Sequence, residues 1–467
     1  MDLQKILTKL HISELNEMQQ HAAEAILGSD GDVVLLSPTG SGKTLAYLLP
    51  LVQAIDHSPL TIDHSPFSQR ECGVARTIDH WPQALVITPG RELALQSHQV
   101  LQSMGCGIRS TACYGGRAAM DEHKVLKEVR PQIVFGTPGR LNDHLDKENI
   151  SRYGIRWLVI DEFDKCLEMG FQQEMQKLIK SLPALERRIL LSATNAEEIP
   201  HFVNMSKKGT LIDFTEEDEQ TSERVTLYEV RSPQKDKLET LRQLLLSVGD
   251  ESSIVFLNYR DSVERVNSYL VEQGFVTSCF HGGLEQRQRE DQLYRFSNGS
   301  ANVLVATDLA SRGLDIPNIQ NIIHYHLPES EEGYIHRVGR TARWDATGRT
   351  FFILNSGESI PEYVEGDVVN YAEAEPQQTT PPQQTTPPQP RMATIYLGKG
   401  KKDKISKGDI VGFLCKAGGL KADEIGRIDV KDRYSYAAIK REKLRQVLQQ
   451  TRGEKLKGIK TIVEEVR

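Results

Sequence analysis

The sequence predicts an α/β protein with two tandem parallel-sheet domains, followed by a small α+β domain. Short apolar runs rich in branched residues alternate with helical stretches, and this alternation starts again after about residue 225. Such runs are typical of strands buried on both faces, and helices between them favour a parallel sheet. A chain of 467 residues has room for about three domains at roughly 100–200 residues each.

The first domain is expected over residues 1–210 and the second over 211–370. The strands predicted for the first domain are 33–36, 84–87, 133–135, 157–160 and 189–191. Those predicted for the second are 254–257, 303–306, 322–325 and 350–354. Within the first domain, residues 53–81 repeat the tetrapeptide I-D-H-S, and we interpret them as an inserted surface loop.

A third, basic domain is expected over residues 392–467, after a linker at 371–391. The linker repeats Pro, Gln and Thr, a composition typical of an extended, disordered tether. The third domain holds 19 Lys and Arg against 10 Asp and Glu, although the whole chain carries a net charge of −7. This imbalance favours a polyanionic partner, but a solvated lysine-rich surface explains it equally well.

Composition narrows the class of protein further. We expect no membrane span, because no run of about 18 apolar residues occurs. The first five residues, M-D-L-Q-K, show no signal-peptide pattern, so we expect a cytoplasmic protein. The six cysteines show no C-x-x-C spacing, so we expect free thiols and neither a disulfide framework nor a zinc site.

A phosphate-binding loop is indicated by S-P-T-G-S-G-K-T at residues 37–44, between a predicted strand and a predicted helix. Glycines let backbone N–H groups approach phosphate oxygens, and the helix N-terminus favours negative charge. Lys43 is expected to neutralise the β- and γ-phosphates of ATP, and Thr44 to bind Mg²⁺. The residues expected to bind the nucleotide here are Ser37, Thr39, Gly40, Ser41, Gly42, Lys43 and Thr44.

The other parts of an ATP-driven motor follow in order. Asp161 and Glu162 end a buried strand; Asp161 is expected to hold Mg²⁺, directly or through water, and Glu162 to activate the attacking water. Ser192 and Thr194 follow the strand at 189–191, and their hydroxyls are expected to reach Asp164 and couple nucleotide state to movement. Arginines of H-R-V-G-R-T-A-R at residues 336–343 are expected to reach the γ-phosphate from the second domain. For Arg340 a solvated or RNA-binding basic face is the alternative.

The set of motifs resembles the DEAD-box RNA helicases over roughly residues 1–370. The motifs that carry the resemblance are S-P-T-G-S-G-K-T (37–44), P-G-R-E-L-A (89–94), G-G (115–116), T-P-G-R (137–140), D-E-F-D (161–164), S-A-T (192–194), I-V-F-L-N (254–258), H-G-G-L-E-Q-R-Q-R (281–289), A-T-D-L-A-S-R-G-L-D (306–315) and H-R-V-G-R-T-A-R (336–343). The resemblance implies two tandem RecA-like domains that close on ATP and bind RNA.

The resemblance also implies roles for single residues. Gln19 matches the glutamine that reads adenine, and Asp315 matches a residue that contacts the ribose or positions a finger arginine. The catalytic set is Glu162, Asp161, Lys43, Arg337 and Arg340, and the coupling set is Asp164, Ser192, Thr194 and His336. The residues implied to line the RNA path are Arg91, Gly116, Thr137, Arg140, Gln286, Arg289, Thr307 and Arg312. Hydroxyls, small residues and arginines suit a sugar–phosphate backbone whose bases are not read, although each arginine could instead form a surface ion pair.

The sequence departs from the family pattern at three places. Phe163 stands where the family name implies Ala, so packing against 192–194 is expected to differ. Gly90 replaces the usual threonine before Arg91, which removes one hydroxyl from the RNA path. The aromatic that usually precedes Gln19 is missing, since that region reads Asp2-Leu3.

The tail resembles the RNA-binding domain of DbpA-type bacterial helicases, which has an RRM-like fold. I-Y-L-G-K-G-K-K-D-K (395–404), G-D-I-V-G (408–412), G-R-I-D-V (426–430), Y-S-Y-A-A-I (434–439) and K-L-K-G-I-K (455–460) carry it. The implied partner is structured ribosomal RNA. Tyr434 and Tyr436 alternate along a strand and so share one face, which either stacks RNA bases or packs in the core.

We therefore expect an ATP- and Mg²⁺-dependent RNA helicase that separates RNA duplexes or remodels RNA–protein complexes, with ribosomal RNA during ribosome assembly as its target. We expect a monomer, although the sequence leaves the oligomeric state open. Two alternatives are a DNA-directed helicase and a non-catalytic RNA-binding chaperone.

Overall fold

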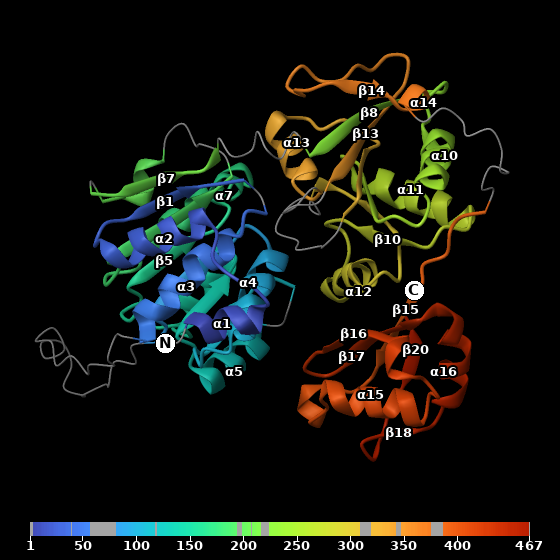
Figure 1. Cartoon of the computed structure of the whole chain (residues 1–467). Coiled ribbons are helices and arrows are strands. Elements are labelled where there is room, and N and C mark those ends of the chain that lie inside the picture. Colours follow the sequence, from blue (N-terminus) through green and yellow to red (C-terminus); the bar gives the residue numbers. More distant parts are fainter. Residues whose placement is uncertain are drawn as a thin grey trace, which may run out of the picture. The chain divides into compact units, whose positions relative to one another are not determined.

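The computed structural model describes most of the chain, and it forms two compact units (Figure 1). The first unit is lobe one; the second contains lobe two and the basic tail. The described residues are 3–38, 40–56, 81–116, 119–193, 199–206, 208–215, 224–308, 319–341, 347–374 and 386–466.

Lobe one is built on a seven-stranded parallel sheet of order β3-β4-β2-β5-β6-β1-β7. Its strands are β1 (Val33–Leu36), β2 (Ala84–Ile87), β3 (Ser110–Cys113), β4 (Ile133–Gly136), β5 (Trp157–Ile160), β6 (Arg187–Ser192) and β7 (Thr210–Asp213). Its helices are α1 (Leu3–Leu10), α2 (Glu17–Gly28), α3 (Lys43–Asp56), α4 (Arg91–Met104), α5 (Ala119–Val129), α6 (Pro138–Asp146), α7 (Phe163–Glu168), α8 (Gln172–Lys180) and the 3-10 turn η2 (His201–Val203).

Two apolar cores cover the two faces of this sheet. Successive side chains of a strand point to opposite faces, so Ala84 and Val86 of β2 join one core, whereas Leu85 and Ile87 join the other. Helices α2, α3 and α4 contribute to the first core, and α6 and α8 to the second. Burial on both faces explains why these strands read as uninterrupted apolar runs in the sequence.

Lobe two repeats the plan with a parallel sheet of order β10-β11-β9-β12-β13-β8-β14. Its strands are β8 (Val225–Arg231), β9 (Ser253–Phe256), β10 (Thr277–Phe280), β11 (Val303–Ala306), β12 (Asn321–His324), β13 (Gly348–Leu354) and β14 (Val368–Asn370). Its helices are α10 (Leu238–Val248), α11 (Arg260–Glu272), α12 (Gln286–Ser297), α13 (Glu331–Val338) and α14 (Tyr371–Ala374).

The tail is a four-stranded antiparallel sheet of order β16-β17-β15-β20 with two helices. Its strands are β15 (Met392–Leu397), β16 (Ile425–Val430), β17 (Ser435–Lys440) and β20 (Val463–Glu465), and β18 (Lys455–Leu456) pairs with β19 (Ile459–Lys460). Its helices are α15 (Lys407–Lys416) and α16 (Leu444–Gln450), with the 3-10 turns η5 (Lys401–Asp403), η6 (Ala422–Glu424) and η7 (Arg441–Lys443). The predicted fold class, two tandem parallel-sheet domains plus a small α+β domain, is confirmed.

The predicted segment boundaries differ from the structure at several places. Helix α3 continues to Asp56, into the predicted insertion, and residues 57–80 of that insertion lie outside the described part. Strand β7 pairs with β1, so lobe one extends beyond residue 210. Within the predicted linker, 371–374 form α14 and the Gln389 amide donates to the Gly274 carbonyl at 3.2 Å, while 375–385 lie outside the described residues.

Candidate nucleotide and RNA sites

The candidate site residues of lobe one share one edge of its sheet. All seven strands run parallel, so their carboxyl ends meet at a single edge, which is where open α/β sheets bind ligands. The phosphate-binding loop follows β1, Asp161 follows β5, and Ser192 ends β6. Arg91, Gly116 and Thr137 follow β2, β3 and β4. In the strand order, the residues predicted to bind nucleotide follow β5, β6 and β1, and the residues predicted to bind RNA follow β3, β4 and β2.

The phosphate-binding loop is held in a conformation that requires glycine. Gly40 and Gly42 have φ angles of 92° and 94°, a region that residues with a Cβ rarely adopt. Lys43 begins α3 and its Nζ donates to the carbonyls of Ser37 and Pro38, the latter at 2.7 Å. The hydroxyls of Ser37 and Ser41 are buried without hydrogen-bond partners in the described chain. Such hydroxyls and a lysine beside a helix N-terminus fit a phosphate group.

Gln19 braces this loop from α2, together with a residue that the sequence did not single out. Asn16 caps α2: its side chain accepts from the Gln19 N–H at 2.9 Å, and the side-chain oxygen Oε1 of Gln19 accepts from the Asn16 N–H at 3.1 Å. The Asn16 amide then donates to the Ser41 carbonyl at 2.9 Å, and that of Gln19 to the Gly42 carbonyl at 3.3 Å. The N-x-x-Q spacing of a capping box was the signal that could have revealed Asn16.

Asp161 and Glu162 form a buried acidic pair at the end of β5. Asp161 is 3% exposed and Glu162 9% exposed. Burial, and next the charge of Glu162, raise the pKa of Asp161 to about 7, while Lys43 acts in the opposite direction. The Asp161 Oδ2 is buried without a hydrogen-bond partner among the described residues. Concentrated negative charge with an unused carboxylate oxygen is a suitable place for a divalent cation.

Glu162 has a left-handed backbone, with φ 51° and ψ 56°, at the N-cap of α7. This conformation is uncommon for a residue with a side chain and is typical of functional sites. Phe163, the departure from the family pattern, is 2% exposed and packs into the second core with residues such as Ile160 and Leu190. Its ring is therefore accommodated by the core behind the acidic pair.

Asp164 and Ser192 are both buried near the acidic pair. An Asp164 carboxylate oxygen accepts from the Lys165 N–H at 2.9 Å, and the Ser192 carbonyl accepts from the Ser37 N–H at 3.0 Å. The latter bond ties the end of β6 to the phosphate-binding loop. Four predicted site residues, Thr39, Thr194, Arg312 and Asp315, lie outside the described residues.

The predicted RNA-path residues of lobe one occupy turns and helix starts. Arg91 begins α4, and its guanidinium lies beside Gly115. Gly116 has a φ of 90°, and Thr137 is the N-cap of α6. Arg140 lies in the first turn of α6, with a side chain 16% exposed. These groups lie after β2, β3 and β4, at one edge of the sheet.

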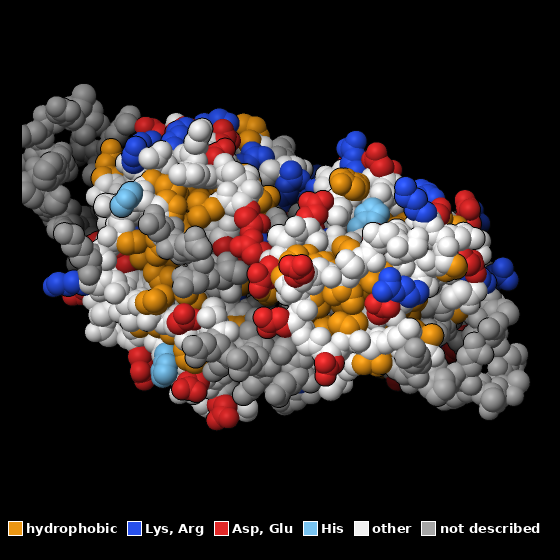
Figure 2. All heavy atoms as spheres, turned by 90° about the horizontal axis from the view of Figure 1, so that it is seen from above, with side chains coloured by type: hydrophobic (Ala, Val, Ile, Leu, Met, Phe, Trp, Pro, Cys, Tyr) orange, Lys and Arg blue, Asp and Glu red, His pale blue; other side chains and the backbone are white. Residues whose placement is uncertain are grey.

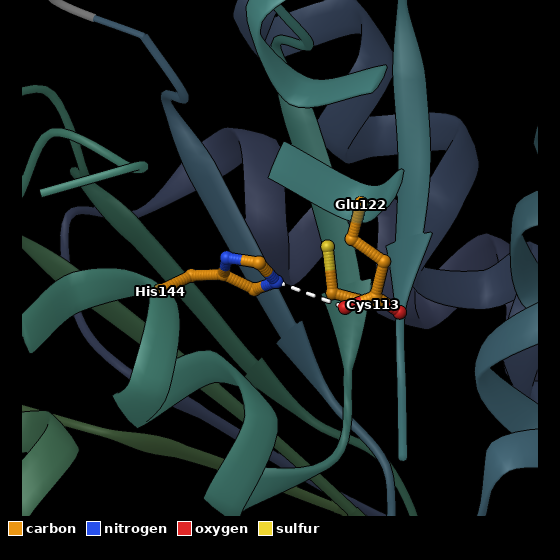
Figure 3. Close-up of side chains that lie close together, drawn as sticks. All are labelled: Cys113, Glu122 and His144. Atoms are coloured by element: carbon orange, nitrogen blue, oxygen red, sulfur yellow. Dashed lines mark hydrogen bonds and ion pairs between the residues drawn. The ribbon is translucent and has the colours of Figure 1, made fainter. Parts of the chain in front are cut away.

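A buried hydrogen-bonded network holds Arg140 in place, and no local sequence pattern predicts it. Arg140 Nε lies 3.5 Å from Glu122 Oε2, which also lies 2.9 Å from Nε2 of the buried His144 (Figure 3). Glu122 Oε1 accepts from the Tyr114 N–H at 3.0 Å. Cys113, Glu122 and His144 have ligand atoms within 4.8 Å of one another. Because the carboxylate already accepts these hydrogen bonds beside a guanidinium, the arrangement favours a hydrogen-bonded network over a metal site.

In lobe two, the predicted RNA-path residues follow β10 and β11. Gln286 is the first residue of α12, and its amide donates to Glu290 at 3.2 Å. Arg289 is 7% exposed and donates to the carbonyls of Leu284, at 3.2 Å, and Gly282, at 2.7 Å. Thr307 follows β11, and its N–H donates to the Phe280 carbonyl at 3.2 Å. Arg289 thus shapes the loop before α12.

Arg337, predicted to reach the γ-phosphate, is a buried residue of lobe two in this structure. It is 0% exposed, and its Nε and Nη2 donate to Asp308 at 2.5 and 3.1 Å. Its other bonds reach His326 O at 2.8 Å, Asn258 Oδ1 at 2.8 Å and His324 Nδ1 at 3.3 Å. A guanidinium has five N–H donors, and all of them are engaged within the lobe.

His336 and Arg340 flank this residue and are also buried, at 1% and 2% exposed. His336 belongs to α13, whereas Arg340 follows the helix, and its N–H donates to the Arg337 carbonyl at 3.3 Å. The structure describes two arginines of this motif, Arg337 and Arg340, and both stay candidates for an arginine finger; Arg343 lies outside the described residues.

The expected base-stacking face of the tail is covered. Tyr436 is 0% exposed, and its ring stacks on Tyr294 of lobe two with centroids 4.9 Å apart. Tyr436 points away from the tail's own core, which contains Ile395, Ala437 and Ile439. Packing of this face in the tail's own core is not found, because α12 of lobe two covers it.

A parallel-sheet lobe with a phosphate-binding loop, a buried acidic pair and the predicted RNA-path residues on one edge is typical of nucleotide-driven helicase motors. Family models agree with this assignment. "DEAD/DEAH box helicase" matches residues 16–202, "Helicase conserved C-terminal domain" matches 236–345 and "DbpA RNA binding domain" matches 394–465. The chain belongs to the DEAD-box family of ATP-dependent RNA helicases, and within it to the type with a DbpA RNA-binding domain.

Relatives and solved structures support the assignment. The ATP-dependent RNA helicase DbpA of Bacillus subtilis is 30% identical over 98% of this chain and 96% of its own length, and that of Escherichia coli is 33% identical over 97% and 96%. Saccharomyces cerevisiae Dbp5 bound to RNA and ADP-BeF3 is 25% identical with a TM-score of 0.62, covering 76% of this chain and 87% of that one. Mss116 bound to single-stranded RNA and UDP-BeF is 26% identical with a TM-score of 0.64, covering 75% and 72%.

The helices of the described residues are all too short or too polar to cross a membrane.

Proposed function

We propose that this helicase uses ATP hydrolysis to separate short RNA duplexes or to remodel RNA–protein complexes, with structured ribosomal RNA as its target during ribosome assembly. The observation that carries the proposal is the shared sheet edge of lobe one. The residues predicted to bind nucleotide, after β1, β5 and β6, lie beside the residues predicted to bind RNA, after β2, β3 and β4. ATP bound at one end of this edge and RNA bound at the other would contact the same rigid sheet.

In this proposal ATP is held by Lys43, the glycine turns and the hydroxyls of Ser37, Ser41 and Thr44. Thr44 and Asp161 would hold Mg²⁺, which supplies charge neutralisation of the phosphates when bound. The unused Asp161 oxygen and its raised pKa support this assignment. Glu162 orients the attacking water and accepts its proton, and Arg340 supplies positive charge to the γ-phosphate.

RNA would lie along Arg91, Gly116, Thr137 and Arg140 on lobe one, and along Gln286, Arg289 and Thr307 on lobe two. We propose that ATP shifts the lobes toward a closed arrangement whose RNA path accepts only a bent single strand. Such a population shift couples hydrolysis to duplex destabilisation, and product release restores the open arrangement. The resemblance of the tail to the RNA-binding domain of DbpA-type helicases leads us to propose ribosomal RNA as the target.

The test measures phosphate release with ribosomal RNA, with unrelated RNA and with single-stranded DNA, beside Glu162→Gln as the inactive control. We expect RNA to stimulate the wild type, ribosomal RNA most strongly, and the control to stay at background. A stronger response to DNA would make the DNA-directed alternative correct. Phosphate release by the wild type no faster than by Glu162→Gln would make the non-catalytic RNA-binding chaperone correct. Strand separation of a labelled duplex distinguishes unwinding from remodelling.

A further inference from the structure

The tail's sheet has two faces, and each is covered by a different part of the chain. Ile395 of β15 and Ala437 and Ile439 of β17 point into the tail's own core against α15 and α16. Thr394 directly precedes Ile395 in β15, and Tyr436 directly precedes Ala437 in β17, so their side chains point to the other face. Both are buried, at 1% and 0% exposed. We call this second surface the tyrosine face, made of Thr394, Tyr396, Tyr434 and Tyr436.

Helix α12 of lobe two covers the centre of the tyrosine face. Tyr294 stacks on Tyr436 at 4.9 Å between ring centroids and an interplanar angle of 28°. The Tyr436 hydroxyl donates to Asp291 Oδ1, and the Tyr434 hydroxyl donates to Glu290 Oε2 at 3.0 Å. Each phenol therefore ends on a carboxylate of the helix, a stronger contact than a hydrogen bond between neutral groups.

A rim of further contacts surrounds this centre. The Arg287 guanidinium lies over the ring of Tyr396, at 5.0 Å. The Asn298 amide donates to Thr394 Oγ1 at 2.8 Å, and Thr394 in turn donates to the Ser300 hydroxyl at 2.9 Å. The Tyr294 hydroxyl donates to the Arg427 carbonyl at 2.6 Å. Aromatic stacking, ionic hydrogen bonds and satisfied polar groups together are typical of a specific interface.

The same helix carries two residues of the proposed RNA path. Gln286 and Arg289 lie three positions apart and so share one side of α12. Glu290, Asp291 and Tyr294, which meet the tail, lie on the adjoining side, and the Gln286 amide donates to Glu290 at 3.2 Å where the two sides meet. One 12-residue helix therefore joins the tail to the RNA path of lobe two.

We propose that the tyrosine face is a clamp that fixes the orientation of α12, with Tyr436 and Asp291 as positioning residues for Gln286 and Arg289, and that it does not stack RNA bases. RNA captured by the tail is then held at a fixed orientation to the RNA path of lobe two. This inference rests on the proposed RNA role of Gln286 and Arg289. It assigns RNA capture by the tail to surfaces other than the tyrosine face.

The first test compares Tyr436→Phe, Asp291→Asn and the double variant in the full chain. Tyr436→Phe keeps the ring and removes only the hydroxyl that reaches Asp291. We expect each single variant to raise the ribosomal RNA concentration for half-maximal ATP turnover about three- to tenfold, with little change at saturating RNA. The double variant should be no worse than the singles, because both remove one contact. Tyr153→Phe, at a tyrosine 58% exposed on lobe one, is the matched control and should change nothing.

The second test uses hydrogen exchange of the α12 amides in the wild type, with and without ribosomal RNA. A clamp keeps α12 covered, so added RNA should leave its exchange unchanged or slower. If bases stack on the tyrosine face, RNA must displace α12 and its exchange must rise, which would overturn the proposal. Unchanged RNA half-saturation in both single variants would also overturn it. Hydrogen exchange does not depend on ATP turnover. It therefore still tests the clamp if RNA does not stimulate ATP hydrolysis and the proposed function is wrong.

Discussion

At the scale of single residues, Arg337 has a structural role in lobe two beside the role at the γ-phosphate that its motif predicts. Its guanidinium donates to Asp308, Asn258, His324 and the His326 carbonyl. Its guanidinium also lies over the Phe256 ring at 5.2 Å. The bonds join residues that follow β9, β11 and β12, so Arg337 ties three strand ends of lobe two together.

Arg337→Gln should therefore lower the stability of lobe two. Removing a fully buried ion-pair partner costs about 3–5 kcal/mol, but Asp308 is 35% exposed, so we expect roughly 2–3 kcal/mol. Urea unfolding of the full chain measures this. Arg340→Gln is the comparison, for which we expect at least about a 10³-fold loss of RNA-stimulated turnover if it is the finger. Lost turnover with unchanged stability in the Arg337 variant would contradict its structural role.

The raised pKa of Asp161 makes stability depend on pH when no nucleotide or cation is bound. Burial raises this pKa to about 7, whereas an unfolded Asp titrates near 4. Between these values the folded chain keeps a proton that the unfolded chain releases, so the free energy of unfolding falls as pH rises through this window. The Asp161→Asn side chain cannot ionise. In unfolding experiments, the free energy of unfolding of this variant should therefore rise relative to that of the wild type between pH 5 and pH 8. A constant difference between the two proteins would show that Asp161 titrates normally.

At the scale of secondary structure, the start of α2 is coupled to the phosphate-binding loop. Asn16 performs two separable tasks: its oxygen caps the helix and its amide holds the Ser41 carbonyl. Asn16→Asp keeps an oxygen for the cap and loses the amide, so we expect a several-fold higher KM for ATP with nearly normal stability. Asn16→Ala should also lose about 1 kcal/mol from the missing cap. Steady-state ATP turnover and thermal unfolding measure the two effects; equal KM values for Asn16→Asp and the wild type would exclude the bracing role.

Strands were predictable from the sequence where both of their faces are buried, because such strands read as short apolar runs. The apolar runs at 33–36, 84–87, 157–160 and 303–306 coincide with β1, β2, β5 and β11. Strand β3, with the sequence S-T-A-C, and β8, whose burial alternates, escaped because neither is an apolar run. The positions of the motif residues in loops were equally predictable, because these motifs directly follow predicted strands. The Glu122 network and the clamp on α12 were not, since each joins residues far apart in the chain through packing that no local pattern encodes.

At the scale of the whole molecule, charge is divided unevenly between the parts of the chain. The tail has nine more basic than acidic residues within a chain of net charge −7. The face shown in Figure 2 carries both acidic and basic side chains. In the tail, Lys401 and Lys402 of η5 and Lys404, which follows it, are all exposed. Exposed lysines near one another contribute to RNA affinity mainly by displacing counterions from phosphates.

Replacing Lys401, Lys402 and Lys404 together by Gln should therefore make RNA binding less sensitive to salt. Each lysine that neutralises a phosphate of a single strand contributes about −0.7 to the slope of log K against log salt concentration, so loss of three reduces the slope by up to about 2. Anisotropy of labelled ribosomal RNA on the full chain, over a series of KCl concentrations, measures it. The matched variant with Arg at the three positions retains the charge and should keep the slope of the wild type. An unchanged slope in the Gln variant would show that these lysines lie outside the RNA contact, and the tail's excess charge would then act through another of its surfaces.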